Sequence, residues 1–592
     1  MPHKRKGFSR FWKELRRRNV LRSLAIYAGS AFIILEAATI IFPRWGLPDW
    51  SIDLVLWLLV LGIFINVIIA WFYDITPGGM LRTKSLEEVS KKEKVQDSRG
   101  WKAATYVSLV VIVALVIFNV FTSSKTLKAG DIQSLLVLPF DNFTGDDQLE
   151  YFVSGMHASL IGDIGKVGGL RVISKTSSDT YKEAGMSIPE IASELNVDAV
   201  VETQVMCLGD SICFQVKVVT PFPEEKQLWV ADYKEEKSQI LNLYNRVTKQ
   251  IANEVLIELS PDEERMLTQS RTVNKEAYDD YLMGLYYWDK LGKEPLEKAL
   301  EYFNSAIELD PEWAPPYAGV ARVWAGMAQM NFVAPQIAGP IIFEHLNKAL
   351  ALDPDFADSH LSLAGIATWI QWDWETGEKE YLKALSINPN NAMARIYYAH
   401  LLMHLQRKKE ALIHAQMAVD LDPLNPLILA LNAVVLCYGD QWEVAHERVE
   451  KAIALDPYHF FAFKALEPVA YHLGNIDGLL KSIRFCLPFE DSIYQSIAVL
   501  AEKEGINAAY SEVVNQLELL GPASQQGPIA MAARYLFLKQ YDKAMEYMEQ
   551  GFEMHDSNTP YIACAYWKSG PLLVNPRFIA LMEKMKLPMP KD

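Results

Sequence analysis

Hydrophobic positions divide the chain into three regions with different spacings. Near the start lie three long apolar runs that are almost free of charge, at residues 23–42, 54–73 and 103–121. Runs of this length match the roughly 30 Å hydrocarbon core of a bilayer. Residues 130–262 then carry short apolar runs, and residues 272–592 carry the spacing of amphipathic helices. The pattern predicts a multi-domain protein: transmembrane α-helices within residues 1–122, then an α/β domain, then an all-α solenoid.

Lysine and arginine predict the orientation of the membrane helices. Residues 1–122 hold 17 Lys or Arg and 9 Asp or Glu. All of these basic residues except Arg44 lie in the tail before the first run or in the 74–102 loop. The positive-inside rule therefore places the tail and that loop in the cytoplasm. Everything after about residue 122 is then extracytoplasmic, in the periplasm if the membrane is a bacterial inner membrane.

The first apolar run has two open questions. A cleaved signal peptide is an alternative to a membrane helix, but the run is long and no small-x-small site follows it. It also contains an ionisable residue, Glu36. An acidic group inside a bilayer is a candidate functional group. The alternative is that Glu36 lies near the outer boundary, protonated or facing a neighbouring helix.

Strands and helices alternate after the anchor. We expect strands at 134–140, 170–174, 199–206, 213–220 and 228–233, and helices at 148–166, 188–196 and 238–258. Ser187, followed by Pro189 and Glu190, is a capping signal for the second of these helices. This order predicts an α/β sheet with helices packed on it.

Two cysteines flank the turn between the third and fourth strands. Cys207 and Cys213 lie on either side of Gly209-Asp210, where residues face each other across a hairpin. A disulfide in an oxidising compartment and a pair of small buried thiols are both compatible with this placement. Five Cys in 592 residues exclude a fold built on disulfides.

A repeated phrase ends helices in the last region. Leu-Asp-Pro or a close variant closes segments at Pro311, Pro354, Pro389, Pro423 and Pro457, with spacings of 43, 35, 34 and 34 residues. A period of about 34 residues is that of a helix–turn–helix unit that cannot bury its apolar face alone. Such units stack into a solenoid whose concave surface binds other chains.

These units resemble tetratricopeptide repeats (TPR). In the unit that ends at Pro423, the positions of the family pattern hold Tyr398, Ala399, Leu402, Ala411, Ala415 and Ala418, and Ala415 departs from the bulky residue usual at its position. The resemblance implies a concave groove suited to an extended or helical peptide of a partner protein. Its candidate residues on the first helices of the units are Arg322, Thr368, Trp369, His400, Met403, His404 and Tyr438, with ordinary packing as the alternative for each.

The α/β region resembles the TolB-amino-terminal-like (FlgO-like) domain. The likeness is carried by Leu135-Leu-Val-Leu-Pro-Phe-Asp-Asn-Phe-Thr-Gly145, Tyr151-Phe-Val-Ser-Gly155, Leu170-Arg-Val-Ile-Ser174 and Leu208-Gly-Asp210. In bacterial membrane proteins this domain often stands between a transmembrane segment and TPR units. Relatives include CadC-type regulators and adenylate-cyclase-associated TPR proteins, which carry a cytoplasmic output module before the anchor. About 20 residues precede the first run here, too few for a folded module, so we expect any output to come from a separate protein.

Little in the sequence indicates catalysis. His400 and His404 are spaced for zinc on one helix face, but no third ligand is evident, so we expect no metal. Nucleophile and metalloprotease motifs are absent from the sequence, and we expect neither enzyme activity nor a cofactor. Residues 123–592 hold 40 basic and 64 acidic residues, which argues against a nucleic-acid partner.

The sequence therefore supports one main hypothesis and two alternatives. The first is an inner-membrane-anchored scaffold whose periplasmic solenoid binds a partner protein or peptide. The second is a receptor subunit that lacks its own output domain and passes partner binding to a cytoplasmic protein. An enzyme with a site in the α/β domain is a remote third.

Overall fold

The computed structural model describes residues 132–222, 224–268, 271–290, 292–330, 332–522, 526–564 and 570–590, with short stretches between residues 20 and 82. The chain forms two compact units, Met1–Ser124 and Lys125–Asp592. In the first unit, β1 (Tyr73–Thr76) and β2 (Gly79–Arg82) make an antiparallel hairpin. Among the described residues, no helix is both long and apolar enough to cross a membrane. Glu36, the third predicted membrane run and most of the first two lie outside the described residues.

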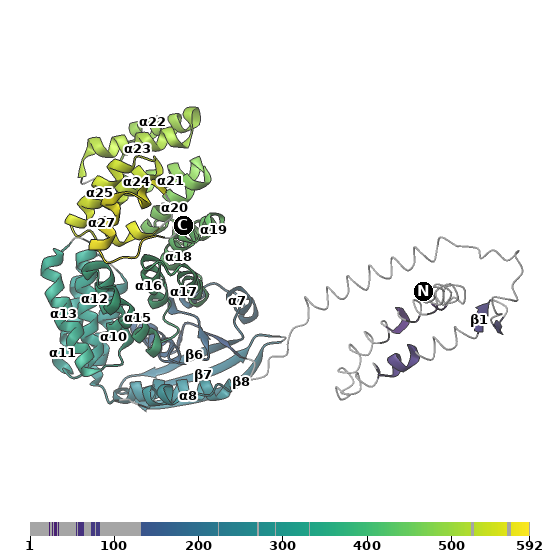
Figure 1. Ribbon diagram of the computed structural model, residues 1–592. Coiled ribbons are helices and arrows are strands. Elements are labelled where there is room, and N and C mark those ends of the chain that lie inside the picture. The colour runs from purple at the N-terminus through teal and green to yellow at the C-terminus, as the bar shows by residue number, and fades with distance from the viewer. Residues whose placement is uncertain are drawn as a thin grey trace, which may run out of the picture. The chain divides into compact units, whose positions relative to one another are not determined.

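A six-stranded mixed sheet begins the second unit (Figure 1). Its strands run in the order β5-β3-β6-β7-β8. The sixth strand, β4, lies off this path and also pairs with β6. β3 is parallel to both neighbours, and β6, β7 and β8 form an antiparallel meander. The bounds are β3 Ser134–Val137, β4 Asp141–Asn142, β5 Arg171–Val172, β6 Ala199–Leu208, β7 Ser211–Thr220 and β8 Lys226–Glu236. The predicted strands and helices occur in the expected order, and the structure adds the short strand β4 and a short helix at Lys175–Asp179 that the sequence pattern does not predict.

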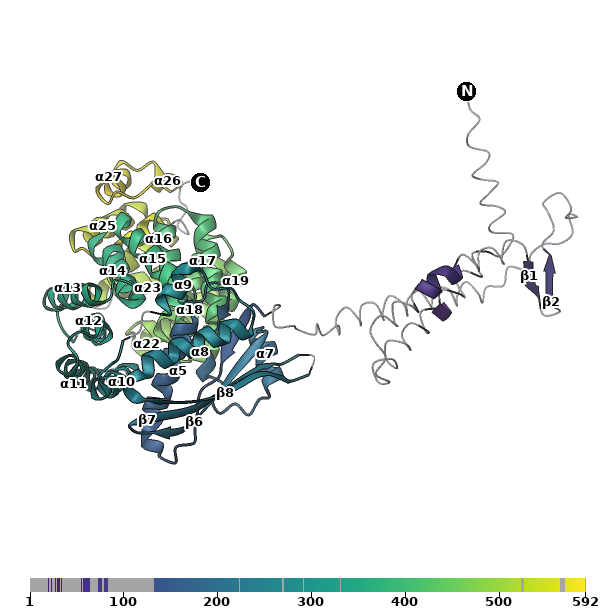
Figure 2. The ribbon, with the colours of Figure 1, turned by 90° about the horizontal axis from the view of Figure 1, so that it is seen from below.

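Helices cover both faces of this sheet. On one face α5 (Glu150–Ile164) and α8 (Ile240–Glu254) pack against a core that contains Leu135 and Val137 (Figure 2). On the other face α7 (Ile188–Leu195) packs against Leu136. Successive residues of β3 thus enter opposite cores, as the two-residue period of a strand requires. The predicted capping box also forms, because the Glu190 carboxylate accepts a hydrogen bond from the Ser187 amide at 2.8 Å.

The rest of the unit is a solenoid of antiparallel helix pairs (Figure 1). Close approach of the helices explains the small residues of the repeat: a Cβ on Gly284 or Gly319 would lie within 2.7 Å of the Phe303 ring. The paired helices are α10 (Lys275–Asp289) with α11 (Lys293–Leu309), α12 (Ala314–Gln329) with α13 (Pro335–Leu352), α14 (Ala357–Ile366) with α15 (Trp374–Ile387), α16 (Ala392–His404) with α17 (Lys408–Leu421), α18 (Pro426–Tyr438) with α19 (Trp442–Leu455), α20 (Phe460–Leu473) with α21 (Ile476–Cys486), α22 (Asp491–Glu504) with α23 (Ile506–Leu520), and α24 (Pro528–Phe537) with α25 (Tyr541–Glu553).

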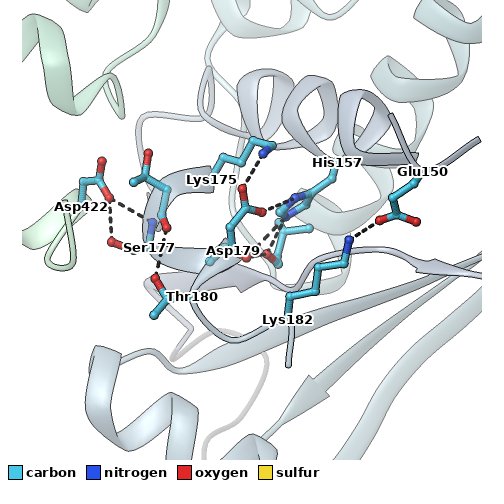
Figure 3. A network of polar contacts seen from close by, with 11 residues as sticks. Glu150, His157, Lys175, Ser177, Asp179, Thr180, Lys182 and Asp422 are labelled. Atoms are coloured by element: carbon cyan, nitrogen blue, oxygen red, sulfur yellow. Dashed lines mark hydrogen bonds and ion pairs between the residues drawn. The ribbon is translucent and has the colours of Figure 1, made fainter. Parts of the chain in front are cut away.

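The turns between solenoid units form hydrogen bonds with the edge of the sheet. Beside β5, Asn390 accepts a hydrogen bond from the Val172 amide at 2.9 Å, and the Ser174 amide donates to the Leu421 carbonyl at 2.9 Å. Asp422, from a Leu-Asp-Pro phrase, accepts from the Ser177 hydroxyl at 2.6 Å in α6 (Lys175–Asp179; Figure 3). The repeat-ending phrase and the residue after it therefore serve a second purpose, because Asp422 binds α6 and Asn390 satisfies an amide of the edge strand β5. We call this contact the junction.

Candidate functional site

The structure places the seven candidate groove residues in or beside the solenoid core. Thr368, His400, Met403, His404 and Tyr438 are buried. Trp369 is partly buried and packs edge-on against Tyr397, with ring centroids 5.0 Å apart. Arg322 pairs with Asp358 at 2.7 Å. These residues do not form an open surface for a partner in this structure.

The chain's own C-terminal part covers His400 and His404. We call residues 555–564 the return segment; it includes the 3-10 helix η6 (Thr559–Ala563). The Tyr561 hydroxyl lies 2.8 Å from His400 Nδ1, and the Cys564 sulfur lies 3.2 Å from His404 Nδ1. Gln406 donates from its side-chain amide to the Ala563 carbonyl. The concave face around α16 is therefore occupied by a segment about 160 residues further along the chain.

Further contacts extend this coverage toward α15. His555 stacks on Trp372 with ring centroids 3.8 Å apart, and its Nε2 donates to the Ile370 carbonyl at 2.6 Å. Trp374 donates from its indole nitrogen to the Met585 carbonyl at 2.8 Å, just after α27 (Pro576–Lys584). Side-chain donors on both sides thus bind backbone carbonyls across this contact.

Burial keeps the two groove histidines neutral. His400 Nε2 lies 3.1 Å from the Leu431 carbonyl, which can only accept, so Nε2 carries the proton and Nδ1 accepts from Tyr561. Desolvation lowers the pKa of His400 to about 4 and lowers the pKa of His404 well below its usual range. Burial also raises the pKa of the Cys564 thiol. The His404–Cys564 pair is therefore neutral and lacks the thiolate of a reactive cysteine.

Neither histidine belongs to a metal site in the part of the chain that the structure describes, where no group of three or more His, Cys, Asp or Glu is placed to hold an ion. His404 has one sulfur neighbour, and His400 bonds a phenol and a carbonyl. A zinc ion takes four ligands in a structural site, and these contacts do not provide them.

A cavity of about 170 Å³ lies beside the return segment, between α18, α20 and α24. Leu431, Val434, Phe461, Ile529 and Phe537 give it apolar walls, and Asn558 and Tyr561 reach it from the return segment. Apolar walls with a few polar groups are typical of small-molecule sites.

A buried ion pair forms one wall of this cavity. Arg534 donates to both carboxylate oxygens of Glu467, at 2.9 and 3.0 Å, and Tyr510 donates to the same carboxylate at 2.7 Å. Burial alone would raise the pKa of Glu467, but Arg534 holds it below its usual value. Gln526 accepts a further hydrogen bond from Arg534 at 3.0 Å. The pair is thus ionised and links α20 to α24.

A second polar cluster lies under the sheet, near the junction (Figure 3). Ser178, His157 and Asp179 follow the order of a nucleophile, base and acid, with separations of 3.4 and 3.5 Å. However, His157 Nε2 lies 3.0 Å from the Val137 carbonyl and must donate to it, so this nitrogen cannot take a proton from Ser178. Ser178 donates to the same carbonyl at 2.6 Å and is fully buried. The geometry is that of a structural network.

The structure joins Cys207 and Cys213 in a disulfide across the β6–β7 hairpin, where the two residues face each other in register. The free cysteines are Cys437, Cys486 and Cys564. Cys437 lies in α18, Cys486 ends α21 and Cys564 follows η6 in the return segment.

Comparisons with known proteins find partial likeness. No family model matches the chain. Over 247 residues the chain is 27% identical to a putative adenylate cyclase 3 of Rhizobium meliloti, a stretch that covers 40% of each protein. It is 27% identical over 143 residues to the transcriptional regulator HilA of Salmonella typhimurium, covering 24% of this chain and 26% of HilA. The chain thus spans less than half the length of either relative.

Solved structures with a similar arrangement of helices include TPR proteins. PilF of Pseudomonas aeruginosa is 16% identical, covering 41% of this chain and 98% of that chain, at a TM-score of 0.29. A thermophilic TPR protein of Thermus thermophilus is 16% identical, covering 34% of this chain and 99% of that chain, at a TM-score of 0.27. At such values the likeness says nothing about function.

Proposed function

We propose that the protein is a membrane-anchored interaction scaffold whose solenoid binds a peptide segment of a partner on the concave face around α16. The observation that carries this proposal is that the return segment already lies there. A surface that holds one peptide through a backbone hydrogen bond and contacts to an aromatic side chain suits other peptides of similar shape.

The contacts indicate which peptide fits. Gln406 and Trp374 donate to backbone carbonyls, which every peptide offers. Selectivity comes from Tyr561, whose ring packs edge-on against His400 and His404 with centroids 5.8 and 4.7 Å away. Ala563 and Cys564 follow it and are fully buried. The preferred partner segment therefore has one aromatic residue followed closely by small residues.

The match between groove and return segment is incomplete. Among the described residues, buried His404 Nε2 and Thr559 Oγ1 make no hydrogen bond. An unsatisfied buried polar atom costs about 1–3 kcal/mol. A partner that bonded His404 Nε2 and carried no unpaired hydroxyl in place of Thr559 would gain that free energy and could compete with the tethered segment.

Anchoring and location are part of the proposal. The three apolar runs and the distribution of Lys and Arg in residues 1–122 support an inner-membrane anchor with the tail in the cytoplasm. The Cys207–Cys213 disulfide supports an oxidising, periplasmic compartment for the second unit. We propose no catalytic activity.

A second candidate is a receptor subunit. The two curated relatives are named as an adenylate cyclase and a transcriptional regulator, both of which produce an intracellular output. In this alternative, partner binding in the groove is passed through the membrane helices to a separate cytoplasmic protein. It requires that the partner bind two states of the chain with different affinity.

Photocrosslinking in native membranes tests the scaffold. A photoreactive residue replaces Trp369 beside the groove in one chain and Val444, exposed on α19, in another. We expect partner adducts from position 369 to increase when Tyr561→Ala loosens the return segment, and those from 444 to stay unchanged. Equal yields of partner adduct at both positions, unchanged by Tyr561→Ala, would overturn the proposal that the partner binds in the groove. A tag after Asp592 that antibodies reach only from the cytosol would overturn the orientation.

A further inference from the structure

The cavity beside the return segment has the size of a small organic molecule. Its volume is about 170 Å³. A dry cavity of about 150 Å³ in another protein binds benzene, so this space holds one ring or a short branched chain. It is too small for a helix, whose diameter with side chains is about 10–12 Å.

One cation on its wall has no close partner. Lys464, in α20, lines the cavity and is partly buried. Within the described part of the chain, its ammonium makes no hydrogen bond or ion pair. The other charged side chains that line the cavity do have such partners. Glu467 is neutralised by Arg534. Burial and then the charge of Arg534 lower the pKa of Lys464, and the charge of Asp556 opposes them. Asp556 itself accepts hydrogen bonds from the Asn558 backbone and side-chain amides at 2.8 and 3.0 Å.

The ionised groups lining the cavity are Lys464, Arg534 and Glu467, which leaves one positive charge in excess. His400 adds none, because desolvation lowers its pKa to about 4. An unpaired, partly buried ammonium is unfavourable, and a carboxylate placed against it would gain a charge-assisted hydrogen bond. Aromatic and aliphatic side chains opposite it offer an apolar surface to the rest of the ligand.

We propose that this cavity binds a small organic monocarboxylate, with its carboxylate on Lys464 and its apolar body against Phe461, Val434 and Ile529. The site goes beyond partner capture and does not require it. Because Asn558 and Tyr561 belong to the lining, the bound ligand contacts both the solenoid and the return segment.

Benzoate and its neutral isostere benzamide test the proposal by calorimetric titration of the full chain in detergent. We expect benzoate to bind the wild-type chain at least tenfold more tightly than benzamide does. Lys464→Met should remove this difference by weakening benzoate alone. The matched control is Lys481→Met on α21, which removes a cation that pairs with Glu450 at 3.5 Å and does not line the cavity.

A second variant tests the cavity itself. Ala533 lines it and is not fully buried, so Ala533→Leu fills the space with little cost to the core. We expect loss of benzoate binding with an unchanged thermal midpoint. The proposal is wrong if benzoate does not bind, if Lys464→Met binds it as wild type does, or if Ala533→Leu leaves binding intact.

Discussion

The solenoid meets the rest of its own chain at two places that use different chemistry. At the junction, the turns around Asn390 and Asp422 satisfy backbone and hydroxyl donors of β5 and α6. At the groove, neutral side chains such as His400 contact the return segment, and His404 Nε2 is left without a hydrogen bond among the described residues. Ser174 Oγ at the junction is likewise buried without a hydrogen bond among the described residues. The two contacts therefore differ in the groups they use: Asn390 and Asp422 satisfy amide and hydroxyl donors at the junction, whereas the groove relies on aromatic packing around Tyr561 and a few hydrogen bonds, a set of contacts that another segment could replace.

The largest effect is expected from the ion pair behind the groove. Arg534→Met leaves Glu467 charged and unpaired in the core, so the free energy of unfolding should fall by about 3–5 kcal/mol, measured by urea denaturation. The double variant Arg534→Met/Glu467→Gln should recover most of this loss. Arg577→Met breaks an exposed pair with Glu549 at 2.6 Å and should cost less than about 1 kcal/mol. An equal loss in the two single variants would contradict the burial of the pair.

The junction should respond next. Asp422→Ala orphans three donors, the Ser177 amide and hydroxyl and the Asn425 side-chain amide, and should cost about 1–3 kcal/mol. Hydrogen exchange should accelerate at the Ser177 amide of α6, which loses its acceptor, and leave the β7 amides unchanged. If exchange at Ser177 stayed slow, Asp422 would not hold α6 against the solenoid.

Acid should weaken the groove. An unfolded histidine binds a proton below about pH 6.5, whereas folded His400 does so only near pH 4, so stability is full above pH 6.5 and falls as pH drops from 6.5 toward 4. At pH 5 the loss is about 2 kcal/mol for this residue. The test compares unfolding of wild type and His400→Gln from pH 8 to 5. The difference between the two chains should stay constant above pH 7 and shrink below 6.5; a constant difference throughout would exclude the buried neutral form.

The smallest effect is expected at an exposed ion pair between the chain that follows the sheet and a solenoid turn. Arg265 in α9 (Pro261–Met266) pairs with Asp355 in a solenoid turn at 2.9 Å, and the Arg265 side chain is 47% exposed. Arg265→Met should lower stability slightly at low salt and have no measurable effect at 1 M salt. A loss of stability that persists at high salt would show that packing rather than charge stabilises this contact.

Local signals in the sequence predict the elements well and their long-range contacts poorly. The two-residue and 3.6-residue spacings give the strand order and the helix pairs, and the Ser187–Glu190 box marks the start of α7. Nothing in the spacing shows that Tyr561 lies against His400, 161 positions earlier, or that Asp422 bonds Ser177. Both contacts depend on how the solenoid curves, which is decided by packing summed over many helices. A weak signal did exist, since residues 555–564 are apolar in places and lack helical spacing.

The junction has a consequence for synthesis. Val172 and Ser177 leave the ribosome long before their partners Asn390 and Asp422, which lie 218 and 245 positions further along the chain. At a synthesis rate of about 5–20 residues per second, the edge strand of the nascent sheet stays exposed for about 10–50 s before the solenoid turns can cover it. An uncovered strand invites pairing with other chains, so during translation this short interval is when the protein most needs a chaperone.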